Sequence, residues 1–160
     1  MTRLRNLTMD TPYIAWLRKQ PALDSKFGYD REDVDIVWFR YDTGDIMIME
    51  EKALSSWPTS AQRDTHGIIH QALEYSCQRI EFERMSLNRP RHLTNWGYHV
   101  IRLENFSPED GRVFIDHARV EPEDLIKFHQ FEFFPCATKV IRYGKEPITV
   151  RGHIPEEGWF

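Results

Sequence analysis

The feature of this sequence that most constrains its fold is a pair of apolar segments joined by a tight turn. The segments are residues 34–41 and 45–52, both rich in Ile, Val, Met and aromatic residues, with Asp42-Thr43-Gly44 between them. This pattern predicts two antiparallel strands in a β-hairpin. The first segment contains Asp35 near its start, and the second ends in Glu50-Glu51-Lys52. The hairpin therefore places an aspartate and a charged strand end close to each other.

The length and composition fit a single domain. A chain of 160 residues with 41% apolar and 13% aromatic residues can bury one core but is too short for two ordinary domains. The net charge of −4 argues against a broadly basic surface, although a locally basic face is enough to hold a nucleic-acid backbone. Cys77 and Cys136 are isolated, which indicates reduced thiols rather than a zinc or iron–sulfur site. We find no membrane-spanning or signal-peptide pattern, and we expect a soluble cytoplasmic protein.

Helix and strand signals alternate along the chain. The strongest helix signal is the capping-box pattern Thr59-Ser60-Ala61-Gln62, followed by helix formers as far as about Ile80. The other expected elements are a helix between Thr11-Pro12 and Pro21, a short strand near 26–29 in a polar, irregular stretch, strands at 98–104 and 111–115, a helix at 121–130, and one or two strands within 141–150. This order predicts an α/β fold with a central mixed sheet flanked by helices.

The charged end of the hairpin is a candidate metal site. Glu50 and Lys52 are two residues apart on a strand and point to one face, whereas Glu51 points to the other. With Asp35, two carboxylates and an ammonium group would then converge on a small volume. Buried carboxylates need a compensating cation, and Mg²⁺ favours one or two carboxylates together with water and phosphate oxygens. The residue types therefore indicate phosphodiester hydrolysis, in which a metal activates the nucleophile and a cation stabilises the developing charge.

These residues resemble a known nuclease motif. Asp35, a gap containing a turn, and Glu50-Glu51-Lys52 at the end of an apolar strand are similar to the D…(D/E)xK motif of the PD-(D/E)XK nuclease superfamily. On the following helix, Gln71 and Tyr75 are similar to the QxxxY motif of the RecB-like and phage exonuclease branch. The resemblance covers about residues 13–104.

The resemblance implies a fold and an activity. The fold would be a restriction-endonuclease-like αβββαβ core at about 11–104 within one domain of residues 1–160, followed by a C-terminal α+β appendage at about 105–160. The activity would be that of a Mg²⁺- or Mn²⁺-dependent deoxyribonuclease, a hydrolase of the kind found in phages, DNA repair and restriction. The implied roles are metal binding by Asp35, Glu50 and the backbone carbonyl of Glu51, water positioning by Lys52, and substrate or outer contacts by Gln71 and Tyr75.

Three departures from the family pattern leave alternatives open. Val34 stands where the motif's name has proline, and Asp33 is a rival to Asp35 as the metal ligand. The first helix lacks the acidic residue of many relatives, since its only flanking acids are Asp10 and Asp24. The alternative function is therefore a catalytically silent module on the same fold that binds nucleic acid or joins an assembly.

Arginines follow the long helix and suggest a DNA-binding surface. They are interleaved with histidine, tyrosine and tryptophan, a mixture that can hold phosphates and stack on bases. A solvated loop with ordinary surface arginines is the competing interpretation. The candidates are Arg79, Arg84, Arg89 and Arg91, with Arg102 further along the chain.

Two further patterns have a structural and a functional interpretation. His66 and His70 are four apart on the long helix and could bind zinc, but the glutamate of an HExxH motif is missing. His70, beside Gln71, could line the groove, although a solvated helix histidine is the simpler interpretation. The aromatic segment 128–135, FHQFEFFP, is expected in the core, with a homodimer interface as the alternative.

Overall fold

The computed structural model describes residues 11–24, 29–33, 36–83 and 90–153. Its elements in chain order are α1 (Pro12–Arg18), the 3₁₀ helix η2 (Pro21–Leu23), β1 (Tyr29–Asp33), β2 (Ile36–Arg40), β3 (Asp45–Lys52), α2 (Ser60–Arg79), β4 (Phe82–Glu83), β5 (Pro90–Arg91), β6 (Thr94–Leu103), β7 (Val113–Ile115), β8 (Ala118–Val120), α3 (Pro122–His129), β9 (Phe133–Arg142) and β10 (Ile148–His153).

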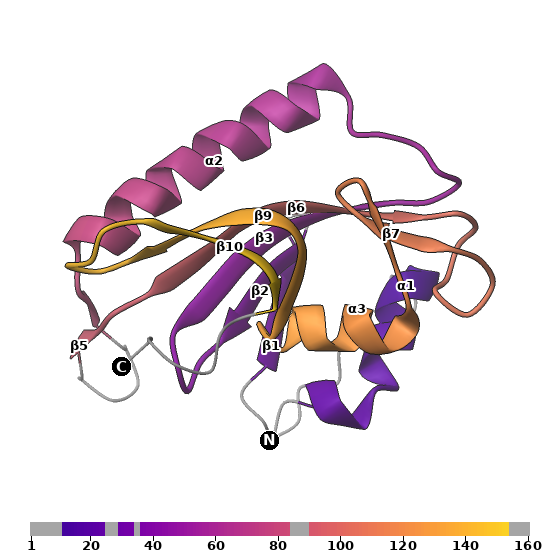
Figure 1. The fold of residues 1–160 in the computed structure, drawn as a ribbon, viewed down its shortest axis with the longest axis horizontal. Coiled ribbons are helices and arrows are strands. Elements are labelled where there is room, and N and C mark those ends of the chain that lie inside the picture. Colours follow the sequence, from indigo (N-terminus) through magenta and orange to yellow (C-terminus); the bar gives the residue numbers. More distant parts are fainter. Residues whose placement is uncertain (1–10, 25–28, 34–35, 84–89, 154–160) are drawn as a thin grey trace.

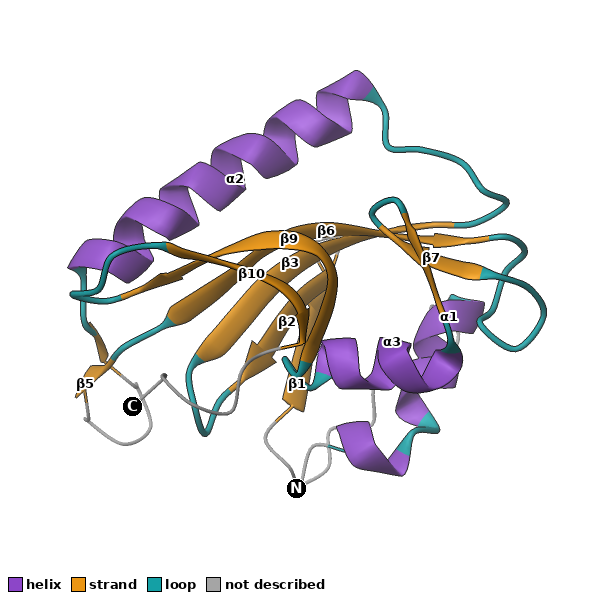
Figure 2. Ribbon diagram, in the orientation of Figure 1, coloured by secondary structure: helices purple, strands orange, loops and turns teal. Residues whose placement is uncertain are grey.

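The molecule is layered around one mixed sheet (Figure 1). In the described part of the chain the sheet has eight strands, in the order β1-β2-β3-β6-β7-β8, with the β9–β10 hairpin joined to β6. Helix α2 lies across one face of the sheet, while α1 and α3 lie on the other (Figure 2). The predicted α/β class with a mixed sheet flanked by helices is thus confirmed. No described helix is long and apolar enough to cross a membrane.

The predicted hairpin forms as β2 and β3. Ile36 pairs with Met49 and Arg40 with Asp45 in an antiparallel ladder. Gly44 closes the turn at φ +84°, and a Cβ there would lie 2.6 Å from the carbonyl oxygen of His92, so this position requires glycine. The polar stretch before the hairpin also forms a strand, β1, which pairs antiparallel with β2. A short strand was expected near 26–29, and the described strand lies at 29–33; a charged strand is well suited to a sheet edge.

Strand β6 connects the two parts of the sheet. One of its edges pairs with β3 in parallel, with Lys52 opposite Arg102. The other edge pairs with β9 near Thr94 and with β7 near Ile101. The strand begins four residues earlier than expected, because Gly97 (φ +97°) accommodates a shift in register rather than ending the strand. The residues after 104 therefore extend the same sheet.

The core lies between the sheet and the α1–α3 layer. Helix α3 forms as expected within 121–130 and buries Leu125 and Phe128 in the same apolar cluster as Trp38 and Met47 of the hairpin. Phe131 and Phe134 belong to this cluster as well. The core interpretation of the aromatic segment 128–135 is therefore confirmed for its three most buried rings.

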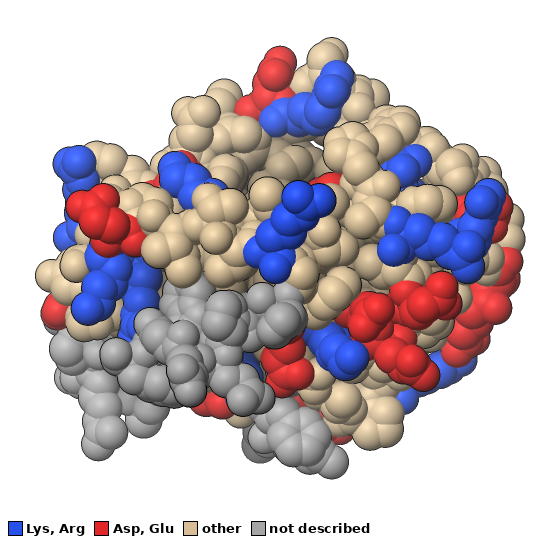
Figure 3. All heavy atoms as spheres, viewed as in Figure 1, with Lys and Arg blue, Asp and Glu red and all other residues tan. Residues whose placement is uncertain are grey.

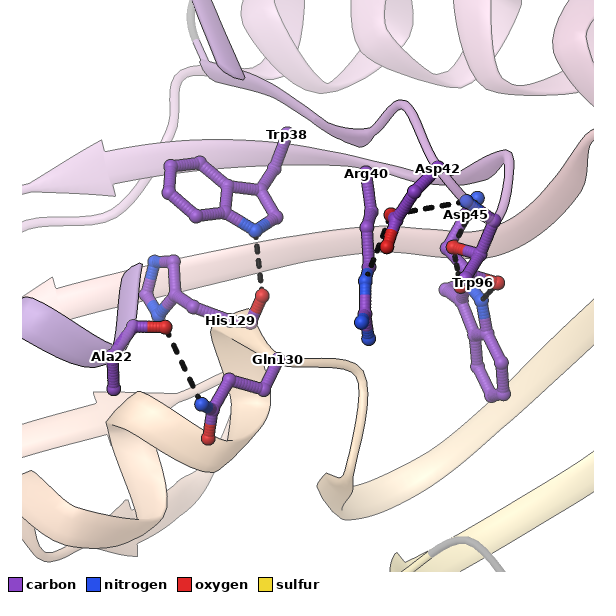
Figure 4. A network of polar contacts seen from close by, with 9 residues as sticks. Ala22, Trp38, Arg40, Asp42, Asp45, Trp96, His129 and Gln130 are labelled. Carbon is purple, nitrogen blue, oxygen red and sulfur yellow. Dashed lines mark hydrogen bonds and ion pairs between the residues drawn. The ribbon is translucent and has the colours of Figure 1, made fainter. Parts of the chain in front are cut away.

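A buried histidine connects α3 to the rest of the core. His129 is fully buried, and its Nδ1 lies 2.8 Å from the carbonyl oxygen of Leu125, to which it donates. Its Nε2 therefore accepts from the Tyr13 hydroxyl at 2.8 Å. Trp38 Nε1 donates to the His129 carbonyl oxygen at 2.6 Å (Figure 4). Burial lowers the pKa of His129 from 6.5 to about 4, so the imidazole is neutral in the folded protein.

His129 should make the free energy of unfolding depend on pH in acid. Its pKa is lower in the folded chain than in the unfolded chain, so its contribution is complete above about pH 6.5 and is lost as the pH falls toward 4. Lowering the pKa from 6.5 to about 4 corresponds to about 3 kcal/mol in the free energy of unfolding. Urea unfolding at pH 7 and pH 4 measures this loss. His129→Gln should lose about 3 kcal/mol less than wild type, whereas the exposed-site control His92→Gln should match wild type.

Candidate functional site

The centre of the candidate site is a glutamate–lysine pair at the end of β3. The Glu50 carboxylate is only 2% exposed, and its Oε1 lies 2.5 Å from Nζ of Lys52. The strand alternation that predicted a shared face for these two side chains is therefore confirmed. Both face α2, because Lys52 also donates to Oε1 of Gln62 at 3.1 Å. An ion pair is thus held between the sheet and the long helix.

Gln62 joins this ion pair to the start of α2. The predicted capping box is present: the Thr59 side chain accepts from the backbone N–H of Gln62, and the backbone N–H of Thr59 donates to Gln62 Oε1 at 3.0 Å. The same Oε1 accepts from Lys52. A single amide oxygen therefore fixes both the first turn of the helix and the direction of the lysine side chain.

His66 contacts the same carboxylate from the helix. Its Nε2 lies 3.2 Å from Oε2 of Glu50, and both side chains are less than 5% exposed. At this distance the two atoms are close enough to interact, but their directions do not meet hydrogen-bond geometry. Glu50 Oε2 is consequently a buried oxygen without a hydrogen-bond partner among the described residues. Such an oxygen is costly unless a further ligand meets it.

Helix α2 presents a polar stripe to the sheet. Gln62, His66, His70 and Glu74 follow at four-residue intervals, and all four are buried or half-buried. His70 Nε2 lies 3.1 Å from Glu74 Oε1. The pKa of His70 is lowered, chiefly by burial and in part by His99 and Lys139, although the Glu74 carboxylate raises it. The polar interior continues along the helix beyond the ion pair.

The structure does not bring Gln71 and Tyr75 to this site. Both are exposed, Tyr75 at 57%, and they lie on the same outer side of α2 as Ile68, which is 69% exposed. A helix turns by about 100° per residue, so the positions after His70 and Glu74 point away from the sheet. Gln62 and His66 occupy the inner positions that the motif resemblance assigned to Gln71 and Tyr75. Their signal in the sequence is the polar four-residue spacing.

The two acids next to the ion pair have different placements. The Glu51 side chain faces the other side of the sheet, where Thr11 Oγ1 donates to its Oε2 at 2.9 Å, so only its backbone remains a candidate ligand. Asp35 lies outside the described residues. Its neighbour Ile36 pairs with Met49, the residue before Glu50. The rival Asp33 ends β1, where its backbone pairs with Ile36.

The predicted arginine surface is only partly described. Arg79 lies at the exposed end of α2, where its guanidinium stacks 4.5 Å above the Tyr75 ring. Arg91 belongs to the small β4–β5 pair, while Arg84 and Arg89 lie outside the described residues. Figure 3 shows cationic and acidic side chains mixed over the face it presents, which agrees with the absence of a broadly basic composition.

Glu50 is a candidate metal ligand within the described residues. No cluster of three or more histidine, cysteine, aspartate or glutamate residues suited to a metal occurs within the described ranges. Glu50 supplies one buried carboxylate oxygen without a hydrogen-bond partner. The zinc pair considered for His66 and His70 is not formed, because each ring contacts a different carboxylate, Glu50 or Glu74. A cation bound by Glu50 would have a carboxylate oxygen as its ligand, which suits Mg²⁺ or Mn²⁺ better than zinc.

Comparisons with known proteins do not assign a function, so any proposal must rest on the geometry of the site. No protein-family model, no curated protein and no solved structure gives a significant match to the chain.

Proposed function

We propose that the protein is a metal-dependent nuclease that hydrolyses DNA phosphodiester bonds between α2 and the end of β3. The observation that carries the proposal is the buried Glu50 carboxylate: Lys52 lies 2.5 Å from one oxygen, and the other has only the His66 contact at 3.2 Å and no hydrogen-bond partner among the described residues. Taking this carboxylate and the lysine out of water is costly. An arrangement that opposes stability in this way is typical of a functional site.

The composition of the α2 interface supports the same proposal. Stability alone would favour apolar side chains between a helix and a sheet. Here the outward side of α2 carries Ile68 and Tyr75, while its inward side carries Gln62 and His66. Burying the polar side of a helix makes sense when those groups position charged side chains. Gln62 orients Lys52 through a hydrogen bond, and His66 packs against the Glu50 carboxylate.

The residues fit a Mg²⁺ or Mn²⁺ ion held by carboxylates. The second oxygen of Glu50 is a buried ligand without a hydrogen-bond partner in the described chain, and Asp35 is the proposed second carboxylate. A bound divalent ion lowers the pKa of its water and neutralises charge on a phosphate. Lys52, oriented by Gln62, places its ammonium group where it can position the attacking water or stabilise the developing negative charge. His66 Nε2 lies 3.2 Å from the other Glu50 oxygen, on the helix side of the carboxylate.

Metal binding gives a direct test. Calorimetry with Mn²⁺ should detect a site in the wild-type protein that is lost in Glu50→Gln and in Asp35→Asn. Glu51→Gln is the matched control, because that carboxylate faces the opposite side of the sheet and the substitution retains the backbone carbonyl. The same wild-type sample should cleave DNA with Mg²⁺ and stop on addition of EDTA.

The outcomes separate the nuclease from a silent module. Metal binding with cleavage supports the proposal, whereas DNA binding without metal binding or cleavage would establish the binding-module alternative. Unchanged Mn²⁺ affinity in Glu50→Gln would show that Glu50 at the end of β3 does not bind the metal.

A further inference from the structure

A second group of side chains lies beside the ion pair. Arg102 of β6 is the parallel partner of Lys52, so the alternation of the two strands brings both side chains to the α2 side. The Arg102 guanidinium carbon lies 3.9 Å above the ring of Trp57, in the loop between β3 and α2. It is also 5.0 Å from the ring centre of Phe114 on β7. Two aromatic rings therefore fix this guanidinium next to the proposed catalytic lysine.

The half-buried Arg102 has no acidic partner among the described residues. Within the described residues it forms no ion pair, and its buried Nε has no hydrogen-bond partner. Contacts with aromatic faces orient a guanidinium without using its N–H donors. Its donors are well suited to phosphate oxygens.

Trp57 offers a stacking surface at the same place. It is 48% exposed, whereas Trp16, Trp38 and Trp96 are each about 5% exposed or less. Its ring lies 5.3 Å from that of His117, in the turn between β7 and β8. In Figure 1 the loop that carries Trp57 leaves the sheet on the β7 side before it reaches α2. A half-exposed tryptophan held against a cation is a natural platform for a nucleobase.

We propose that Trp57 and Arg102 form a nucleotide subsite that directs single-stranded DNA to the Lys52–Glu50 site. Trp57 stacks on one base, and Arg102 binds the adjoining phosphate. The inference rests on the proposed function for its choice of DNA as the ligand. A base can stack on Trp57 only when it has left its neighbours in a duplex, so the subsite selects single strands or frayed ends over paired DNA.

The test measures binding without catalysis. A fluorescently labelled oligothymidylate of about ten nucleotides and a duplex of the same length are titrated with protein in EDTA, so that no cleavage occurs. Trp57→Ala should weaken single-strand binding by about tenfold to a hundredfold, the usual range for loss of one stacked base. Trp57→Phe should restore most of the affinity, and Arg102→Gln should weaken binding and reduce its salt dependence. Phe106→Ala, which removes another exposed aromatic ring, is the matched control and should bind as wild type.

Each outcome bears on the subsite separately from the nuclease. Wild-type affinity in Trp57→Ala, equal loss on single-stranded and duplex DNA, or no DNA binding at all would overturn the subsite. Thermal melting of each variant confirms that its fold is intact, and Trp57→Phe provides a conservative substitution if the alanine variant does not fold. Trp57-dependent binding without metal-dependent cleavage would keep the subsite and overturn the nuclease, whereas cleavage without Trp57-dependent binding would do the reverse.

Discussion

Lys52→Met is expected to reduce Mg²⁺-dependent DNA cleavage by about a hundredfold to a thousandfold, the usual effect of removing one group that stabilises charge in a transition state. Methionine keeps the length and packing of the side chain but removes the ammonium group that lies 2.5 Å from Glu50. The reduction should appear mainly in kcat, because the proposed role of Lys52 is in the chemical step. Single-turnover cleavage of a labelled oligonucleotide measures it.

Lys127→Met is the matched control for this loss. Lys127 lies on α3, on the opposite side of the sheet, and is 55% exposed beside Asp124. Its substitution changes the net charge by the same amount without touching the site, so cleavage should remain at the wild-type rate. Equal activity in Lys52→Met and wild type would remove Lys52 from the mechanism.

The second large effect concerns stability. Lys52→Met should lower the free energy of unfolding by about 3–5 kcal/mol at pH 7, because it leaves the Glu50 carboxylate, 2% exposed, without its ammonium partner. The double variant Glu50→Leu/Lys52→Met removes both charges together and should be as stable as wild type, or more stable by about 1–4 kcal/mol. Urea unfolding of the single and double variants measures the difference.

The double variant also separates activity from folding. It should be stable and inactive, which would show that the pair is maintained for function. If Lys52→Met is too unstable to assay, the double variant still tests whether cleavage requires the pair. A double variant far less stable than wild type would instead show that the pair stabilises the fold.

The sequence predicted the elements that depend on local signals. The hairpin turn requires Gly44, and its apolar strands have the expected composition, so β2 and β3 form within the expected segments. The capping box at Thr59 correctly marked the start of α2. Strand alternation alone was enough to place Glu50 and Lys52 together and Glu51 apart.

The rotation of α2 about its axis was not predictable from these signals. Ile68 and Tyr75 form one stripe and His66 and His70 another, and apolar residues usually face the sheet. In this protein the polar stripe faces the sheet instead, because the sheet face beneath α2 carries Glu50 and Lys52, which need polar partners. Only the three-dimensional pairing reveals that requirement.

Two strand boundaries depend on tertiary context in the same way. β1 consists mainly of charged residues and becomes a strand because β2 offers it a free edge. β6 continues through Gly97, which reads as a break in isolation, because β3 and β9 pair with the residues before it. Local strand propensity is weak evidence where pairing with a neighbouring strand determines whether a segment becomes a strand.

The shared oxygen of Gln62 makes this position less tolerant of substitution than an ordinary helix cap. Glutamate serves a capping box as well as glutamine does. At residue 62, however, a second carboxylate would compete with Glu50 for the same ammonium group. Replacing Gln62 by glutamate would therefore suit the helix cap but disturb the Lys52–Glu50 ion pair. Substitution at the start of α2 should be restricted by Lys52, ten residues earlier in the chain.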